Sequence, residues 1–371
     1  MEHAKRVIVA MSGGVDSSVA ALLLHEQGYE VIGVSMQVWD YRRSGCLSAS
    51  AGKTSCCAPC DLNDARRVAN MIGIPYYVFD FEELFEKEVI DKFVRSYGAG
   101  LTPNPCIDCN VKIKFGELRK RADSLGVGLL ASGHYARIEK RSDGYHLLRG
   151  KDPVKDQSYF LYGLSQGELA KTLFPLGSLT KAETRAIAAR KGLKTAGKAE
   201  SQDVCFVPGS VSDFLLAMGL APRPGEIIRR DGTKVGSHDG IHRFTVGQRH
   251  GLKVGGSDAP LYVLGLDVSA GRVIVGKREE LELSQSFLVG ELNWCGPQGF
   301  PGGWQKRFGC IAQLRYRHRG VAVEVELLDK YLVRVRFAGG PTAVCPGQAA
   351  VFYCMENEEV LGGGTILRDG E

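Results

Sequence analysis

A short glycine- and serine-rich segment between an apolar strand and a helix constrains the fold of this chain most. The sequence Ser12-Gly13-Gly14-Val15-Asp16-Ser17-Ser18 directly follows the apolar run 7–10 and precedes the helix-forming run 19–24. Adjacent glycines allow a tight turn, and the following helix presents free N–H groups and partial positive charge at its N-terminus. The serine hydroxyls add hydrogen-bond donors, and Asp16 is a potential Mg²⁺ ligand. The segment predicts a phosphate-binding loop.

This loop differs from the Walker A motif. The Gly-Lys-Thr tripeptide at residues 52–54 has Leu47 where that motif needs its first glycine, and no apolar strand precedes it. We interpret the tripeptide as a surface loop. The Ser-Gly-Gly-Val-Asp-Ser sequence instead resembles the pyrophosphate loop of the N-type ATP pyrophosphatases, which cleave ATP between the α and β phosphates. That resemblance implies adenylation of a substrate oxygen rather than kinase chemistry.

The first half of the chain alternates apolar strands with amphipathic helices. Strands are expected at 7–10, 30–38, 75–79 and 127–132, and further helices at 61–73, 82–97 and 112–125, with a proline- and cysteine-rich loop at 102–110. This alternation predicts an α/β fold with a doubly wound parallel sheet. Ligands of such sheets bind at the carboxyl ends of the strands, where the Ser-Gly-Gly loop lies.

Beyond about residue 208 the pattern changes to short β-rich segments separated by glycine-containing turns. Strands expected at 309–314, 321–328, 331–337 and 349–354 have the spacing of a small antiparallel barrel. We therefore expect three domains: a parallel-sheet domain at 1–208, a small β-rich central domain at 209–284, and a C-terminal antiparallel β-barrel at 285–371.

Composition and charge allow predictions about where the protein is located and what it binds. The N-terminus leads straight into a predicted core strand and no apolar run has membrane-spanning length, so we expect a cytoplasmic protein with no membrane partner. The net charge is only +5, but arginine and lysine concentrate at 223–253 and 306–320. These stretches are either solvated surface or a contact for a phosphate backbone.

Two of the eleven cysteines are candidates for reactive thiols. Cys109 is expected just before a helix N-terminus and is followed by Lys112 and Lys114, which favour its thiolate. Cys205 lies far along the chain in a polar loop. Either residue alone is also compatible with an ordinary buried thiol, and Cys295, Cys310, Cys345 and Cys354 are interpreted as small core residues.

The cysteine spacing leaves metal-binding hypotheses open. Cys57–Cys60 and Cys106–Cys109 are two Cys-x-x-Cys pairs, with Cys46 and Cys56 nearby, and two such pairs can form a zinc site. Cys106, Cys109 and Cys205 could instead hold an iron–sulfur cluster with an open iron. We favour neither, because Cys-x-x-Cys equally suits thiol exchange and a strand and a helix separate the pairs.

Motifs spread over nearly the whole chain are similar to those of the tRNA-specific 2-thiouridylase family. After the pyrophosphate loop come Pro-Asn-Pro-Cys-Ile-Asp-Cys-Asn (103–110), Gly-His-Tyr-Ala-Arg (133–137), Lys-Asp-Gln-Ser-Tyr-Phe-Leu (155–161), Ser-Gln-Asp-Val-Cys-Phe (201–206), Gly-Gln-Arg-His-Gly-Leu (247–252), Leu-Arg-Tyr-Arg (314–317) and Pro-Gly-Gln-Ala-Ala-Val (346–351). The resemblance implies ATP-dependent 2-thiolation of the wobble uridine of tRNA. In that reaction the uracil C2 oxygen is adenylated, and sulfur is then transferred from a cysteine persulfide with release of AMP and pyrophosphate.

The resemblance also implies roles at matching positions, with residues 1–208 as the catalytic domain and the two β-rich domains in contact with tRNA. Cys109 matches the nucleophile and Cys205 the persulfide carrier. The implied contacts to ATP, with Mg²⁺, are Ala10, Met11, Ser12, Gly13, Gly14, Val15, Asp16, Ser17, Met36 and Gly133. Those to the target base are Asn104, Pro105 and Cys106, and those to tRNA are His134, Lys155, Asp156, Gln157, Arg315, Tyr316 and Gln348. The implied partners are the anticodon arm of tRNA and a sulfur-relay protein or cysteine desulfurase as sulfur donor.

One position departs from the family pattern. Many members carry Asp, a candidate general acid–base, where this chain has Cys106, and Asp108 is expected to point elsewhere from an extended loop. Three alternative functions stay open. Another N-type ATP pyrophosphatase, RNA-modifying or amidotransferase-like, would not need two distant cysteines, an iron–sulfur-dependent thiolase would need the cluster, and a non-enzymatic RNA-binding module would not need the ATP loop.

Overall fold

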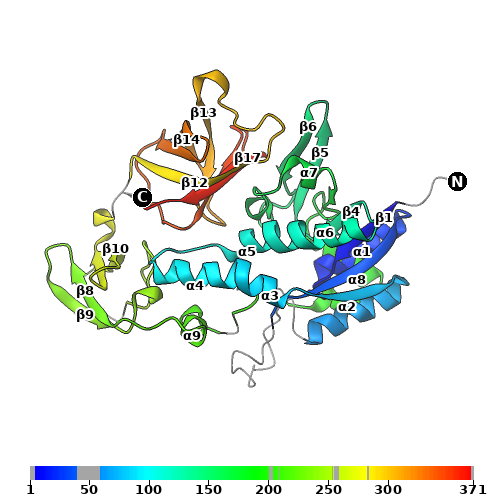
Figure 1. Cartoon of the computed structure of the whole chain (residues 1–371), viewed down its shortest axis with the longest axis horizontal. Helices are drawn as coiled ribbons and strands as arrows, with labels where there is room; N and C mark the ends of the chain where they lie inside the picture. Colours follow the sequence, from blue (N-terminus) through cyan, green and yellow to red (C-terminus); the bar gives the residue numbers. More distant parts are fainter. Residues whose placement is uncertain are drawn as a thin grey trace.

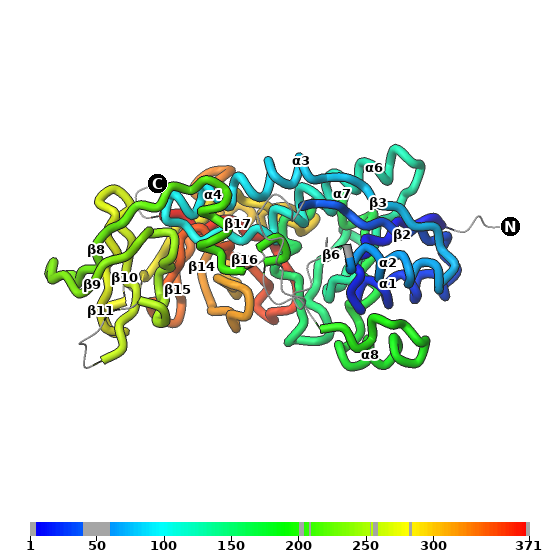
Figure 2. The backbone as a smooth tube through the Cα atoms, turned by 90° about the horizontal axis from the view of Figure 1, so that it is seen from below, coloured from blue at the N-terminus to red at the C-terminus, as the bar shows by residue number. Residues whose placement is uncertain are grey.

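The computed structural model describes residues 5–39, 59–199, 204–207, 209–252, 254, 259–281 and 284–368. Three β-sheets occupy different parts of the molecule, and the helical segment of residues 82–98 runs between the first sheet and the second, beneath the third (Figure 1). The N-terminal strand lies at one end of the molecule and the small second sheet at the opposite end (Figure 2). Within the described residues, no helix is both long enough and apolar enough to cross a bilayer.

The first sheet has five strands in the order β3-β2-β1-β4-β7. They are β1 (Arg6–Ala10), β2 (Glu30–Gln37), β3 (Tyr76–Asp80), β4 (Leu129–Ser132) and β7 (Thr172–Leu173). The central strand β1 runs parallel to both neighbours, with Val7 opposite Val31 on one side and Leu129 on the other. Because the strand order reverses at β1, the carboxyl end of β1 is the switch point where such sheets bind ligands. The predicted parallel sheet is confirmed.

Alternate residues of β1 enter two different apolar cores. Val7 and Val9 pack with α1 (Val15–Glu26), α2 (Pro59–Ile72) and α8 (Lys181–Arg190) on one face. Ile8 packs on the other face with the helices of residues 82–98 and 105–124. Since all three side chains are fully buried, the strand is apolar without alternation, as expected for a parallel sheet covered on both faces.

The helices of the second face each contain a wider stretch with i→i+5 hydrogen bonds. The first consists of α3 (Glu82–Phe85), η1 (Glu86–Ile90) and α4 (Asp91–Gly98), and the second of α5 (Pro105–Asp108), η2 (Cys109–Glu117) and α6 (Leu118–Ser124). The expected loop at 102–110 is too long, because a helix begins at Pro105. Asn104 caps this helix by accepting a hydrogen bond from the Cys106 N–H at 3.2 Å, and proline suits the first helical position.

The C-terminal barrel is confirmed, and it is closed by a strand that the sequence did not reveal. Its strands are β12 (Ser286–Trp294), β13 (Arg307–Gln313), β14 (Val321–Asp329), β15 (Leu332–Phe337), β16 (Ala349–Tyr353) and β17 (Glu359–Ile366), and β12 pairs with β17 to close it. Three consecutive glycines lower the strand propensity of β17. They fit because a Cβ at Gly362 or Gly364 would overlap the facing carbonyl of Asn293 or Gly290.

A hairpin from the first half of the chain extends the barrel sheet. Strands β5 (Ala136–Arg141) and β6 (Gly144–Arg149) form the hairpin, and β6 pairs with β17. Arg149 anchors it: the guanidinium donates to Asp156 at 2.6 Å and to Gln313 at 2.9 Å, and lies 3.6 Å from the centre of the Tyr353 ring. The hairpin therefore joins residues 1–208 to the barrel.

The small second sheet has the order β10-β11-β8-β9, from β8 (Gly225–Arg229), β9 (Lys234–His238), β10 (Tyr262–Asp267) and β11 (Arg272–Gly276). Its own core includes Ile227, Val263, Val273 and Val275, as expected for a separate β-rich unit. The remaining short elements are α7 (Gln166–Leu169), α9 (Val211–Ala217) and the 3-10 turns η3 (Ser158–Phe160), η4 (Lys194–Gly197), η5 (Ile241–Arg243), η6 (Arg278–Glu280) and η7 (Gly303–Gln305).

We expect Arg149→Leu to destabilise the protein by about 3 kcal/mol or more, because it leaves the buried Asp156 carboxylate without its cation. The matched control Arg6→Leu breaks an exposed pair with Glu30 and should cost less than about 1 kcal/mol. Melting temperatures and urea midpoints of both variants test this. Equal effects would contradict the anchoring role of Arg149.

Candidate active site

The pyrophosphate loop connects the end of β1 to the start of α1, at the switch point of the sheet. Gly13 has φ +70°, and a Cβ there would overlap the backbone of Asp61, so this position accepts only glycine. The Ser17 hydroxyl accepts a hydrogen bond from the Ser12 N–H at 3.1 Å and lies 3.3 Å from the Gly14 carbonyl. The hydroxyls thus brace the turn, while the helix N-terminus faces the strand ends.

Neighbouring strands bring the other predicted ATP contacts to the same place. Gly133 follows β4 directly, and a Cβ on it would lie 2.7 Å from the Ser17 nitrogen, so the two backbones pack against each other. Met36 is near the carboxyl end of β2, the other neighbour of β1. The residues proposed for ATP from segments 10–17, 36 and 133 therefore share one edge of the sheet.

Two lysines at this loop were missed by the sequence analysis. Lys181 Nζ lies 2.8 Å from each carboxylate oxygen of Asp16. Lys198 donates to the Gly13 carbonyl at 3.0 Å and also pairs with Asp61 and Asp64. Burial alone would lower the pKa of Lys198, but its hydrogen bonds and the charges of both carboxylates outweigh this and raise it.

For Lys181, the sequence indicates the helix start but not the side chain's partner. The Thr180-x-x-Glu183 capping box predicts a helix start next to Lys181, and the structure contains that box. Which loop the lysine faces depends on the packing of α8 against α1, which the sequence does not specify.

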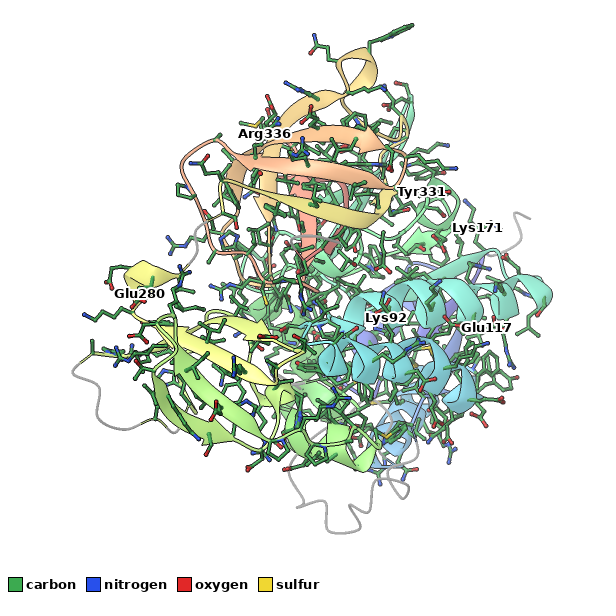
Figure 3. The ribbon with its side chains drawn as sticks, turned by 60° about the vertical axis from the view of Figure 1, so that its left-hand side comes forward. Lys92, Glu117, Lys171, Glu280, Tyr331 and Arg336 are labelled. Atoms are coloured by element: carbon green, nitrogen blue, oxygen red, sulfur yellow. The ribbon has the colours of Figure 1, made fainter. Side chains whose placement is uncertain are left out.

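Cys109 occupies a different helical position from the one expected. It is the fifth residue of the helix that starts at Pro105 and the first of the wider stretch, so Cys106 rather than Cys109 lies in the first turn. Cys106 is exposed and Cys109 is half-buried. Lys92 binds the Asp108 carboxylate at 3.1 Å, on the helix that passes beneath the barrel (Figure 3). Burial raises the pKa of Asp108, against the opposing effect of the Lys92 charge. Asp108 therefore does not lie in an extended loop, as the sequence led us to expect. It belongs to the helix that starts at Pro105, and its carboxylate pairs with Lys92.

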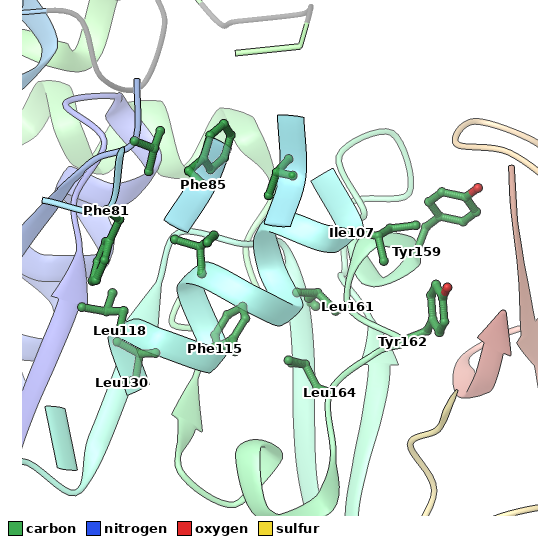
Figure 4. Packing of buried hydrophobic residues seen from close by; sticks show 14 of the residues in the cluster. Phe81, Phe85, Ile107, Phe115, Leu118, Leu130, Tyr159, Leu161, Tyr162 and Leu164 are labelled. Carbon is green, nitrogen blue, oxygen red and sulfur yellow. The ribbon is translucent and has the colours of Figure 1, made fainter. Parts of the chain in front are cut away.

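Cys205 lies beside the same pair of helices. The next residue, Phe206, packs edge-on against Phe85 and Phe93, with ring centres 5.4 Å apart in both cases. Cys109 and Cys205 both pack against one apolar core. Figure 4 shows Phe85, Ile107 and Phe115 of that core. The fold therefore brings two cysteines that lie 96 positions apart in the sequence onto one apolar core.

The metal hypotheses find no support in the described part of the chain. No group of three or more His, Cys, Asp or Glu side chains there is placed to hold a metal ion, and Cys106, Cys109 and Cys205 are all among the residues searched. Cys60 is exposed near the start of α2. Cys46, Cys56 and Cys57 lie outside the described residues.

Four of the predicted RNA-contacting segments meet around Tyr159 and Phe160. The Tyr159 hydroxyl donates to the Ala349 carbonyl at 3.0 Å, next to Gln348. Burial raises the pKa of this hydroxyl well above its usual value, and the nearby Asn104 side chain opposes that effect. The Tyr316 ring is 4.5 Å from the Phe160 ring. Residues 155–157 directly precede these aromatic residues, so the fold gathers segments from both halves of the chain.

Several of these residues make interior contacts rather than facing solvent. The Asp156 carboxylate accepts hydrogen bonds from the Gly150 and Ser158 N–H groups at 2.9 and 3.1 Å, besides its Arg149 pair. The Gln157 side chain accepts a bond from the Tyr135 N–H at 3.0 Å. Lys155 is half-buried and Arg315 is exposed. The two cationic residues are therefore the ones best placed to reach a phosphate backbone.

His134 is also buried, between the rings of Phe115 and Phe174. Its Nδ1 lies 2.7 Å from the Ser132 hydroxyl. Burial, assisted by the charge of Lys114, holds the pKa of His134 well below its usual value. The imidazole is therefore neutral at neutral pH.

The carboxyl-edge loop on a parallel sheet defines an ATP-pyrophosphatase-type nucleotide-binding domain, here joined to two β-domains. The family model described as tRNA methyl transferase HUP domain matches residues 5–209. The tRNA methyl transferase PRC-barrel domain matches 212–277, and the aminomethyltransferase beta-barrel domain matches 284–366.

Relatives align over nearly the whole chain. The tRNA-specific 2-thiouridylase MnmA of Geobacter metallireducens is 49% identical and the alignment covers 98% of this chain and 96% of that protein. The proteins of the same name from Geotalea uraniireducens and Leptospira interrogans are 48% and 43% identical, with 98% of this chain and 95% of each relative covered. The chain belongs to the tRNA-specific 2-thiouridylase family.

We expect His134 to make stability depend on pH. Its pKa is depressed in the folded state, so its contribution is complete above the unfolded pKa of about 6.5 and is lost as pH falls below it. Urea midpoints from pH 7.5 to 5.5 should therefore fall less steeply for His134→Gln than for the wild type. His25→Gln, at an exposed site on α1, should follow the wild type; identical slopes for all three proteins would contradict the assignment.

Proposed function

We propose that this enzyme replaces the C2 oxygen of the wobble uridine of tRNA with sulfur, using ATP. One observation carries the proposal: a single helix links the three parts that this reaction needs. Its cap, Asn104, lies beside Tyr159, around which the predicted RNA-contacting segments meet, and its fifth residue is Cys109. Its Phe115 packs against His134, which follows the predicted ATP contact Gly133.

Adenylation solves the chemical difficulty of the reaction. The uracil C2 oxygen is a poor leaving group, so it attacks the α phosphate of ATP and pyrophosphate departs. The oxygen then leaves as part of AMP when sulfur adds to C2. The loop of residues 10–17, with Met36 and Gly133, would hold the nucleotide phosphates through backbone N–H groups and the helix N-terminus.

The sulfur comes from a persulfide on Cys205, and two routes satisfy the electron balance. The terminal sulfur can attack C2 directly, after which the Cys109 thiolate attacks the Cys205 sulfur and the S–S bond to the transferred sulfur breaks. Alternatively Cys109 first displaces hydrosulfide, which then attacks C2. Both routes leave a Cys109–Cys205 disulfide, so an external thiol must supply two electrons before the next turnover.

The remaining assignments follow from this chemistry. The target base has to leave the anticodon stack to reach Asn104, Pro105 and Cys106. We assign catalysis to residues 1–208, and tRNA contacts to the β-rich parts 209–284 and 285–371, where Arg315 is exposed. The partners we propose are the anticodon arm, Mg²⁺ bound with ATP, and a sulfur-relay protein or cysteine desulfurase. The cytoplasm supplies all of them.

The decisive test is formation of 2-thiouridine from unmodified tRNA. Purified protein with ATP, Mg²⁺ and a persulfide donor should thiolate the RNA, as measured by mass spectrometry of digested nucleosides. Cys109→Ser and Cys205→Ser should each lower the rate on the order of 10³-fold or more, because each removes a sulfur that forms a bond in the reaction. Cys354→Ser, on a barrel turn, is the matched control and should retain activity.

Other outcomes separate the alternatives. Pyrophosphate release without thiolated nucleoside would indicate another ATP pyrophosphatase. If neither pyrophosphate nor thiouridine forms with any tRNA, a non-enzymatic RNA-binding role gains support. Rescue of Cys205→Ser by inorganic sulfide would keep the carrier role of Cys205 and favour the hydrosulfide route.

We expect Gln348 to act on the target-base segment rather than on tRNA affinity. Its side-chain amide donates to the Thr102 carbonyl at 2.8 Å, and the Thr102 N–H donates to the Pro346 carbonyl at 3.0 Å. Gln348→Ala should therefore lower the thiolation rate about 10-fold or more by loosening the segment before Asn104, with tRNA affinity within about twofold of the wild type. Rate and affinity are measured separately, by single turnover and filter binding. Gln305→Ala, exposed on the barrel, is the control; weaker tRNA binding with an unchanged rate would make Gln348 an RNA contact instead.

A further inference from the structure

The pyrophosphate loop contains a charge that opposes its proposed ligand. Asp16 lies in the first turn of α1, whose N-terminus would hold the phosphates of ATP. A carboxylate there stabilises the helix, but it repels an anion bound at the same helix end. A cation is therefore needed beside Asp16 when the nucleotide binds.

Lys181 supplies that cation from the chain itself. Its ammonium nitrogen is 2.8 Å from both carboxylate oxygens of Asp16, and the Tyr135 hydroxyl donates to one of them at 2.8 Å. The Lys181 side chain is only 11% exposed, whereas that of Asp16 is 33% exposed. Both carboxylate oxygens of Asp16 therefore already accept hydrogen bonds, and the positive charge of Lys181 opposes close approach of a Mg²⁺ ion to this carboxylate.

The surrounding structure holds Lys181 in this position. It is the first residue of α8, where Thr180 and Glu183 form the capping box and the Asp152 carboxylate accepts the Lys181 N–H at 2.9 Å. One turn later, the fully buried Thr184 hydroxyl bonds to the Tyr135 hydroxyl at 3.0 Å. Helix α8 packs beside α1, so the base of the side chain cannot move away from the loop.

Lys198, the other lysine at the loop, has a different role. It pairs with the two carboxylates of Asp61 and Asp64 and also binds the Gly13 carbonyl. Its charge is more than offset by these partners, and it holds the loop backbone from the side of α2. The described carboxylate that pairs with Lys181 belongs to Asp16, in the first turn of α1. The Lys181 ammonium therefore lies beside the helix end proposed for the phosphates.

We propose that Lys181 is a nucleotide-binding residue, whose ammonium contacts the phosphates of ATP and is positioned by Asp16 and Tyr135. An ammonium has three donors on a flexible stem, so it can turn from the carboxylate toward a more highly charged phosphate without movement of α8. This inference rests on the proposed binding of ATP at the loop and names the residue that supplies the positive charge there.

The test measures nucleotide binding without chemistry. Calorimetric titration with α,β-methylene ATP, in excess Mg²⁺ and without tRNA, gives the dissociation constant for a nucleotide that cannot be cleaved between these phosphates. We expect Lys181→Gln to weaken binding at least 10-fold, with adenosine binding and tRNA affinity within twofold of the wild type. The matched control is Lys191→Gln, near the other end of α8, where the lysine pairs with the exposed Glu26; it should bind as the wild type does.

A double-mutant cycle separates direct contact from simple neutralisation of Asp16. If Lys181 contacts phosphate, the Asp16→Asn, Lys181→Gln double variant stays at least 10-fold weaker than Asp16→Asn alone. Equal affinities of those two variants would overturn the proposal, since Lys181 would then act only by cancelling the Asp16 charge. Should Lys181→Gln alone be unstable, the double variant carries the comparison because it removes the Asp16 carboxylate together with the lysine that pairs with it. Wild-type affinity in Lys181→Gln also overturns the proposal, whereas a wild-type protein that binds no nucleotide defeats the proposed function itself.

Discussion

Contact between backbones at the end of β1 is the constraint on which the rest of the structure depends. Gly13 lies against the backbone of Asp61, and Gly133 lies against the first turn of α1. Neither position has room for a side chain, so the loop, α2 and the end of β4 are fixed relative to one another. Lys198 strengthens this arrangement from inside, because it joins the Gly13 carbonyl to Asp61 and Asp64. A rigid loop of this kind keeps its N–H groups oriented before the nucleotide arrives.

The helix that starts at Pro105 connects this rigid loop region to the segments predicted to contact RNA. Its start is held by the barrel through Thr102, and its middle packs against His134. Lys92 ties the same helix to β12 by bridging Asp108 and Glu291, at 3.1 and 3.2 Å. The Thr102 and Lys92 contacts therefore link the position of the barrel to the helix that bears Cys109.

The sequence was sufficient for the fold class and insufficient for the contacts between its parts. The apolar run of β1, the paired glycines and the glycine-punctuated strands of the barrel are local signals, and they predicted the parallel sheet and the barrel correctly. The start of the Cys109 helix was missed because Thr102–Pro105 reads as a loop until the Asn104 cap is recognised. Strand β17 was missed because its glycines are explained only by the carbonyls that face them.

The site followed the same division. Motif resemblance predicts the roles of Cys109, Cys205 and the loop residues. It could not reveal that Asp156 and His134 are buried, since burial depends on Arg149 and Phe174 from other segments. Lys181 was missed because a lysine in a polar helix is expected at the surface unless the packing of α8 on α1 is known. Lys198 was missed because it follows the short turn η4, whose packing against α1 and α2 the sequence does not specify.

The β5–β6 hairpin has a consequence for how this architecture diversifies. Since β6 pairs with β17, and Arg149 of the hairpin reaches Gln313 and Tyr353 of the barrel, the barrel is not an exchangeable module at its own chain boundary. Recombination between relatives that replaced only the C-terminal residues would combine a hairpin and a barrel whose contact residues do not match. A successful exchange has to bring the hairpin with the barrel, so two segments separated by the whole central sheet are expected to be inherited together.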